Sequence, residues 1–108
     1  MENKSLGKSS TGIEPNMAAL LSYLLGFITG VIFYLVEKEN KFVRFHAMQS
    51  IIVFGTLFLA GVIIGFIPVL SVIFWTAELV LWIVLMIKAY QGEKFKIPIA
   101  GDMAEKNA

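Results

Sequence analysis

The chain has 108 residues, of which 57% are hydrophobic and 16% are charged, and its mean hydropathy is +0.77. A soluble domain of this size could not bury so much apolar surface, so the composition predicts an integral membrane protein. A net charge of +1 gives no electrostatic basis for binding nucleic acid. Without cysteine there are no disulfides or thiolate sites, and a single histidine excludes the usual multi-histidine metal sites within one chain.

The chain opens with a polar segment at residues 1–16, which has no periodicity and is predicted to be a flexible tail. Residues 17–36 follow without a charge. At about 1.5 Å per residue, a helix over this run is roughly 30 Å long, which matches the hydrocarbon core of a bilayer. The run is too long for the apolar core of a cleaved signal peptide. Gly26 and Gly30 have the Gly-x-x-x-Gly spacing, which predicts close packing against another helix.

A polar turn at residues 37–41 leads into the string KFVRFHAMQS at 41–50, which holds the only arginine and the only histidine. Apolar side chains recur there at three- and four-residue spacing, so one helical face is mostly apolar. This pattern predicts a short interfacial amphipathic segment that leads into the second membrane span.

Residues 51–67 carry no charge and predict the second span, with Gly61 and Gly65 repeating the Gly-x-x-x-Gly spacing. Pro68 is predicted to end this span, because proline lacks a backbone donor and clashes with the preceding turn. Residues 69–89 predict a third span. The uncharged link between the two runs is so short that they should form an antiparallel hairpin.

The predicted fold is therefore all-α and integral to the membrane, with three transmembrane helices and an interfacial segment before the second. The chain divides into a flexible polar tail at 1–16, a three-helix membrane domain at 17–90 and a cytoplasmic tail at 91–108. Gly92 is expected to stop the last helix, and the tail beyond it is expected to lie extended on the surface.

Three spans place the two ends of the chain on opposite sides of the membrane. One side then holds two basic residues, Lys4 and Lys8. The other holds seven: Lys38, Lys41, Arg44, Lys88, Lys94, Lys96 and Lys106. The positive-inside rule makes the side with seven basic residues cytoplasmic. We therefore expect a multi-pass protein of the cell membrane with its N-terminus outside and its C-terminus inside.

Glu78 is the one acid inside a predicted span. An ionised group there is costly, so a lone intramembrane carboxylate suggests a functional role, such as a place in a transport pathway. The alternative is a neutral acid that forms a hydrogen bond across the bundle to Ser22, Thr29 or Thr56. Because no span holds a second acid for a proton relay, the structural interpretation is favoured.

The central string holds three further candidate functional residues, Arg44, His46 and Gln49. His46 suggests pH sensing or substrate binding, but an interfacial histidine bonded to a backbone carbonyl or a headgroup is the favoured interpretation. Arg44 is expected to set topology and to contact anionic headgroups. The chain has no phosphate loop, nucleophile–base pair or metal-ligand spacing, so we expect neither an enzyme nor a cofactor.

The string EKENKFVRFHAMQS at 37–50 resembles the central motif of a family of small uncharacterised archaeal and bacterial membrane proteins. Residues 21–30 and 88–99 fit the same family, and the resemblance covers roughly 17–106. That family is similar to the chloroplast inner-envelope import component known as Tic twenty. The resemblance implies an association with a protein-conducting translocon.

The expected function is that of a small membrane scaffold, or a Tic-twenty-like component related to protein translocation. It would act in the lipid bilayer by helix packing, as a homo-oligomer or with other membrane proteins. The alternative is a minor channel or transporter for a small solute, with Glu78 in the pathway.

Overall fold

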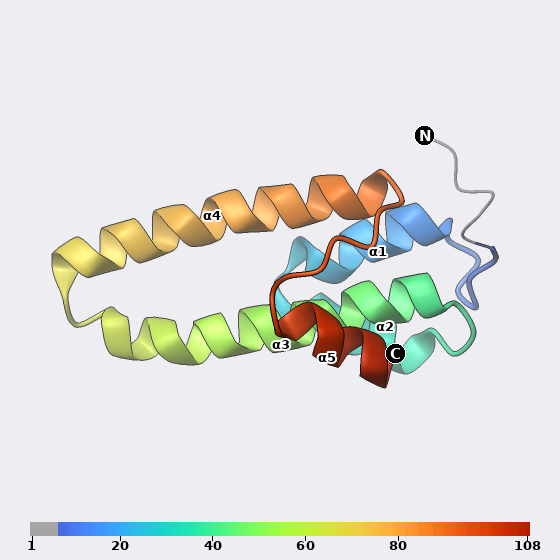
Figure 1. The fold of residues 1–108 in the computed structure, drawn as a ribbon, viewed down its shortest axis with the longest axis horizontal. Coiled ribbons are helices and arrows are strands. Elements are labelled where there is room, and N and C mark those ends of the chain that lie inside the picture. Colours follow the sequence, from blue (N-terminus) through green and yellow to red (C-terminus); the bar gives the residue numbers. More distant parts are fainter. Residues whose placement is uncertain (1–6) are drawn as a thin grey trace.

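The computed structural model describes residues 7–108, and this part of the chain is entirely helical apart from turns and one extended segment. The helices are α1 (Pro15–Leu24), α2 (Phe27–Val36), α3 (Lys41–Ile64), α4 (Pro68–Tyr90) and α5 (Ala100–Asn107). Helices α3 and α4 form a long antiparallel hairpin, and the shorter helices gather around one half of it (Figure 1). The all-α prediction is confirmed for these residues.

The predicted span at residues 17–36 is wrong, because the chain reverses direction in its middle. Gly26 has φ of 62°, a left-handed conformation that glycine adopts readily, and it divides the run into α1 and α2. Each helix has 10 residues, or roughly 15 Å, which is too short to cross a 30 Å hydrocarbon core. Within residues 7–108, only α3 and α4 are long and apolar enough to cross a membrane, so there are two such helices, not three.

Helix α3 begins at Lys41 because the side chain of Asn40 caps it, accepting a hydrogen bond of 3.0 Å from the backbone N–H of Val43. The helix then continues unbroken through residues 41–50 to Ile64. The string at 41–50 is therefore not a separate interfacial segment. Most of it is buried against α1, α2 and the C-terminal residues.

The hairpin turn follows the short uncharged link that the sequence predicts, but Pro68 has a different role. Helix α3 already ends at Ile64, and Pro68 lies in the first turn of α4, where its missing N–H costs nothing. At the far end of α4, Gly92 has φ of 83° and ends the helix as predicted.

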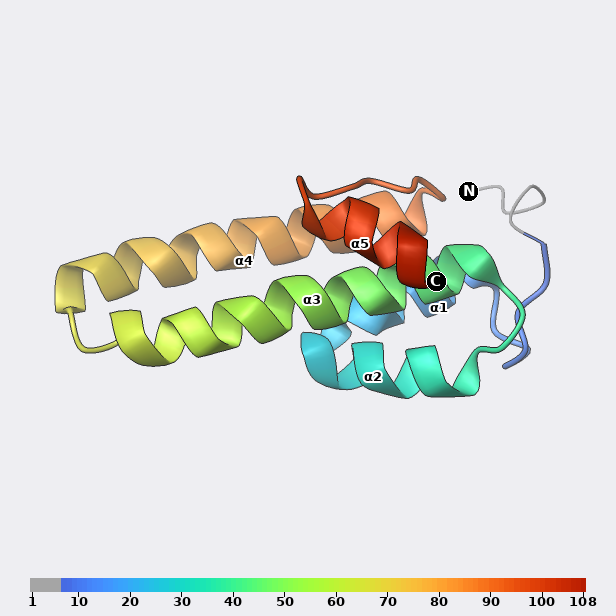
Figure 2. The ribbon, with the colours of Figure 1, turned by 60° about the horizontal axis from the view of Figure 1, so that its bottom comes forward.

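Residues 91–99, which we call the strap, leave α4 and run back beside α3 before α5 packs on α3 (Figures 1 and 2). The predicted extended tail is thus correct for the strap only, and α5 was not predicted. We call this packed half of the molecule the base, and the end of the α3–α4 hairpin at residues 55–77 the tip. The buried apolar cluster belongs to the base: Ala19, Tyr23, Phe42, Val53, Phe54, Leu85 and Ala89.

The first described residues also lie at the base. The Lys8 carbonyl accepts a hydrogen bond of 3.0 Å from the Asn40 side chain, and Asn16 donates one of 3.1 Å to the Tyr90 carbonyl. These contacts bring residues 8–16 to the same end of the hairpin as the strap. The expected placement of the two chain ends on opposite sides depended on three spans, and it has no support in a two-helix hairpin.

Candidate functional site

A buried cluster of polar side chains lies at the centre of the base, and we call it the hub: Tyr23, His46 and Gln49. The Tyr23 hydroxyl lies 2.7 Å from His46 Nδ1 and accepts a hydrogen bond of 2.8 Å from Gln49 Nε2. All three side chains are fully buried. Since His46 and Gln49 are three residues apart on α3, they share a helix face, and both are directed at α1.

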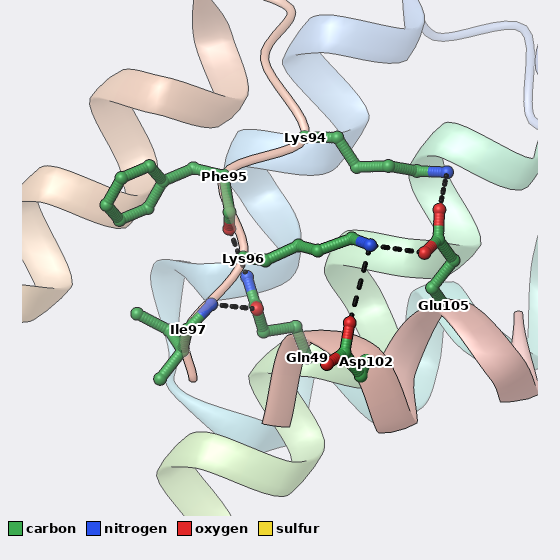
Figure 3. A network of polar contacts seen from close by, with 7 residues as sticks. All are labelled: Gln49, Lys94, Phe95, Lys96, Ile97, Asp102 and Glu105. Carbon is green, nitrogen blue, oxygen red and sulfur yellow. Dashed lines mark hydrogen bonds and ion pairs between the residues drawn. The ribbon is translucent and has the colours of Figure 1, made fainter. Parts of the chain in front are cut away.

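The hub also holds the strap through the strap's backbone. His46 Nε2 lies 2.8 Å from the Glu93 carbonyl oxygen. Gln49 donates to the Phe95 carbonyl at 2.9 Å and accepts from the Ile97 N–H at 2.9 Å (Figure 3). One amide side chain therefore satisfies both a donor and an acceptor of an extended segment, as a neighbouring β-strand would.

The hydrogen-bond partners define the tautomer of His46. A carbonyl can only accept, so the proton on the ring lies on Nε2, which faces the Glu93 carbonyl. Nδ1 is then an acceptor, and the Tyr23 hydroxyl donates to it. The hydroxyl oxygen still accepts from Gln49 Nε2. A doubly protonated ring would leave the Tyr23 O–H without an acceptor, so the geometry fits a neutral histidine.

Arg44 is directed at the end of α2. Its Nη1 donates to the carbonyl oxygens of Tyr34 at 2.9 Å and Glu37 at 2.6 Å. The guanidinium also lies over the Tyr34 ring, 4.1 Å from its centroid. Carbonyls at a helix C-terminus lack intrahelical partners, so Arg44 satisfies groups that α2 cannot satisfy itself. The structure gives this residue an internal role beside the expected headgroup contact.

A fully buried acid, Glu37, was not singled out from the sequence. Its carboxylate accepts hydrogen bonds from the backbone N–H groups of Ser10, Glu39 and Asn40, at 2.7 to 3.2 Å. Burial raises the pKa of this carboxyl, but the backbone donors together hold it below its ordinary value. Glu37 thereby fixes the loop before α3 to the N-terminal segment.

The first glycine pair serves two different purposes. Gly26 makes the bend between α1 and α2, and the Ser50 hydroxyl donates to its carbonyl at 2.7 Å. Gly30 lies where α2 crosses α3: a Cβ there would come within 2.9 Å of the Ala47 carbonyl and of Ser50 Oγ. Only Gly30 therefore lies at a close helix–helix contact, which was expected of both glycines.

The second pair lies in the tip. A Cβ on Gly61 would lie 3.2 Å from the Phe74 ring and 3.3 Å from the Trp75 ring, so this glycine lets α4 come close to α3. Gly65 follows the last residue of α3, and its N–H donates to the Gly61 carbonyl at 2.8 Å. Gly65 therefore contributes to the end of the helix and not to contact between helices.

Glu78 lines an open cavity of about 300 Å³ between the α1–α2 bend and the hairpin, with Gly26, Phe54, Trp75, Leu79 and Trp82. Its carboxylate makes no hydrogen bond or ion pair with any residue among 7–108. The predicted partners Ser22 and Thr29 instead donate to backbone carbonyls, at 3.0 and 3.1 Å. The predicted cross-bundle hydrogen bond of Glu78 is therefore absent.

Sequence reasoning missed one member of the hub, Tyr23, and most of the groups that the hub contacts. Tyr23 and Trp82 lie within apolar runs, and Trp82 Nε1 donates to the Tyr23 carbonyl at 2.7 Å. A polar tip on a buried aromatic ring usually has a partner, so these two residues could have been singled out. The strap carbonyls could not, because backbone groups have no sequence signature.

The hub is saturated by contacts within the chain. Every buried side-chain nitrogen or oxygen among residues 7–108 has a hydrogen-bond partner. In the same residues, no three histidine, cysteine or acidic side chains form a group that could hold a metal ion. The arrangement therefore fastens α1 and the strap to α3, and it presents no free reactive group at its centre.

These features define a class: a small helical membrane protein in which a long apolar hairpin carries a polar hub at one end. The family is shown by sequence comparison. The chain belongs to the MamF/MmsF family, described as the magnetosome magnetite crystal formation protein family, whose profile matches residues 12–104.

Its relatives include membrane proteins of two archaea. A UPF0132 membrane protein of Methanocaldococcus jannaschii is 53% identical over 104 residues, covering 94% of each chain. One from Archaeoglobus fulgidus is 45% identical over 98 residues, covering 87% of this chain and 95% of its own. No solved structure matches this chain significantly. These matches support the expected archaeal membrane-protein family, and they carry no link to Tic twenty.

Proposed function

We propose that this protein is a non-enzymatic scaffold of the membrane, which presents a fixed helical surface to other membrane components. The saturated hub is the observation that supports this proposal most directly. Its polar side chains are used to hold α1 and the strap against α3, and such satisfied networks make a structure rigid. Rigidity of this kind suits a surface that partners recognise.

The recognition surface in this proposal is the outer face of α4. Most residues of α4 are exposed and few are fully buried within the protein, so a wide face of this helix is left for lipid or another membrane protein. We propose that it packs against a second copy or against other membrane proteins in the cell membrane. The basic residues of the base, including Lys38, Lys41 and Arg44, favour a cytoplasmic position for this end.

The partner could belong to a protein-conducting machinery, as the resemblance to Tic twenty implies. The family description instead refers to magnetite crystal formation. A scaffold of the membrane is compatible with either setting.

A photoreactive side chain at Ile83, which is exposed on α4, would test the scaffold proposal in the host membrane. We expect protein adducts, identified by mass spectrometry, that are lost when Gln49→Leu disrupts the base. The matched control carries the reagent at buried position Leu85 and should give none. Adducts with lipid alone, from Ile83 and from other exposed α4 positions, would contradict the proposal.

The cavity beside Glu78 favours a second candidate, a minor channel or transporter for a small solute. The carboxylate lies in an apolar helix and has no hydrogen-bond or ion-pair partner among residues 7–108, which suits a group that meets a passing cation or proton. Flux into liposomes that disappears with Glu78→Gln, while the variant remains folded, would support this candidate over the scaffold.

A further inference from the structure

The tip of the α3–α4 hairpin carries no ionisable side chain. Residues 51–77, which include the turn, hold neither an acid nor a base. The turn itself exposes large apolar side chains: Phe66 is 84% exposed, and Ile63 and Val69 are each 72% exposed. A turn that emerged into water on the far side of a membrane would normally be polar, so these residues fit hydrocarbon better than water.

The backbone of the turn is also suited to hydrocarbon. The N–H groups of Gly65, Phe66 and Ile67 donate to the carbonyls of Gly61, Ile63 and Ile64, at 2.8, 3.4 and 2.9 Å. The next residue, Pro68, has no N–H to satisfy. Backbone donors inside a bilayer must be satisfied within the protein, and these three N–H groups meet that requirement without water.

The charged side chains on and beside α5 indicate how far water must extend along that face of the base. Lys96 pairs with Asp102 and Glu105, and the Asp102 side chain is 81% exposed (Figure 3). Met103 lines the same groove as Val53 of α3, so these charges lie beside the middle of α3. Exposed charges are costly in hydrocarbon, so on this face the water boundary lies near Val53.

The remaining length of the hairpin is too short to cross the membrane. From Val53 to Phe66, α3 and its turn extend roughly 20 Å at about 1.5 Å per residue, against about 30 Å of hydrocarbon. Helix α2 lies on a different side of α3 from α5 (Figure 2). It exposes apolar side chains along its length, including Ile28, Ile32 and Leu35. The boundary between water and lipid therefore runs obliquely across the base.

We propose that the α3–α4 hairpin enters the bilayer from one side, at a tilt, and that its tip stays within the hydrocarbon core. The partner of the tip is then lipid acyl chain, and the outer surface of α2 rests on lipid while α5 faces water. Every described charge except Glu78 lies at the base, on the side of entry. This topology does not depend on the scaffold role.

Single cysteines test the topology, since the chain has none of its own. Lys38→Cys, Phe66→Cys and Asp102→Cys would be labelled with a membrane-impermeant maleimide in intact vesicles of both orientations. We expect Cys labelling at positions 38 and 102 from the same side, and labelling at 66 from neither side until detergent is added. Labelling at 66 from the side opposite to 102 would overturn the proposal, because the hairpin would then cross the membrane.

A depth measurement gives an independent readout. A fluorophore on the same cysteine at 66 should be quenched at least twice as strongly by nitroxides near the ends of lipid acyl chains as by nitroxides on headgroups. The fluorophore at 102 is the control and should show the reverse order. Stronger headgroup quenching at 66 would overturn the proposal even if maleimide failed to label that position.

Discussion

The base and the tip are built on the same two helices, but different forces give them their shapes. In the base, buried hydrogen bonds of Tyr23, His46 and Gln49 connect segments far apart in the sequence. In the tip, α3 and α4 meet through apolar contacts alone, such as those of Gly61 with Phe74 and Trp75. Buried polar groups cost most when they lose a partner, so the base should be far more sensitive to substitution than the tip.

Replacing Gln49 with leucine should have the largest effect. The substitution leaves the partly buried Phe95 carbonyl and Ile97 N–H without their side-chain partner and removes a donor to the buried Tyr23 hydroxyl. Each such loss costs about 1–3 kcal/mol, so the total should be about 3 kcal/mol or more. The measurement is denaturation in lipid–detergent bicelles. Thr56→Val, exposed in the tip, is the control, and an equal loss there would remove the contrast between the two regions.

Two glycines on neighbouring helices sharpen the comparison. Gly30→Ala should destabilise the protein by about 1–3 kcal/mol, because the new methyl group meets the Ala47 carbonyl and Ser50 within 2.9 Å. Gly55→Ala meets nothing within 4 Å and should stabilise α3 by about 0.5–1 kcal/mol, from helix propensity. The two melting temperatures should move in opposite directions. A shared sign would mean that α2 does not press against α3 as described.

Acid should weaken the base through Glu37. Its pKa is lowered in the folded protein, so its contribution is complete above the unfolded pKa and is lost as pH falls through the folded pKa. Glu37→Gln should cost about 1–2 kcal/mol at neutral pH and should flatten the acid limb of the stability curve. Melting temperatures of both proteins from pH 7 to pH 3 measure this. If the melting temperatures of the two proteins fall in parallel between pH 7 and pH 3, the pH dependence belongs to groups other than Glu37.

Glu78, at the boundary between base and tip, should have the smallest effect. No described residue is paired with its carboxylate, so Glu78→Gln leaves no partner without a hydrogen bond, and stability should change by less than about 0.5 kcal/mol. Glu78→Leu should be equally mild, and the same melting assay checks both. A loss comparable to that of Gln49→Leu would show that Glu78 has a partner within the folded protein or its assembly.

The sequence predicted the hairpin and the helical class because long uncharged runs and a short link have direct physical consequences. It failed at residues 17–36 because a bend inside an apolar run depends on distant groups. Ser50 and Trp82 bind the carbonyls of Gly26 and Tyr23 near the bend. Without these partners, the same twenty residues would be expected to form one continuous helix.

For the candidate site, the composition singled out the correct stretch but predicted the wrong environment for it. Arg44, His46 and Gln49 stood out as rare polar residues between apolar runs; His46 and Gln49 lie at the centre of the base, and Arg44 lies half-buried beside the end of α2. The sequence could not reveal their internal contacts, because their partners are mainly backbone carbonyls, which every residue carries. An interfacial location was therefore expected. Long-range pairing of this kind becomes visible only when the chain is folded.

The strap also determines the order in which the protein can be completed. Gln49 reaches its strap partners 46 and 48 residues later in the chain, and His46 reaches Glu93 after 47 residues. Until the ribosome has added residue 97, these polar side chains have no permanent partner, although the hairpin and its turn already exist. Closure of the base therefore cannot precede synthesis of the whole hairpin, and a chain stalled before the strap would carry an open, polar core that quality-control proteases could recognise.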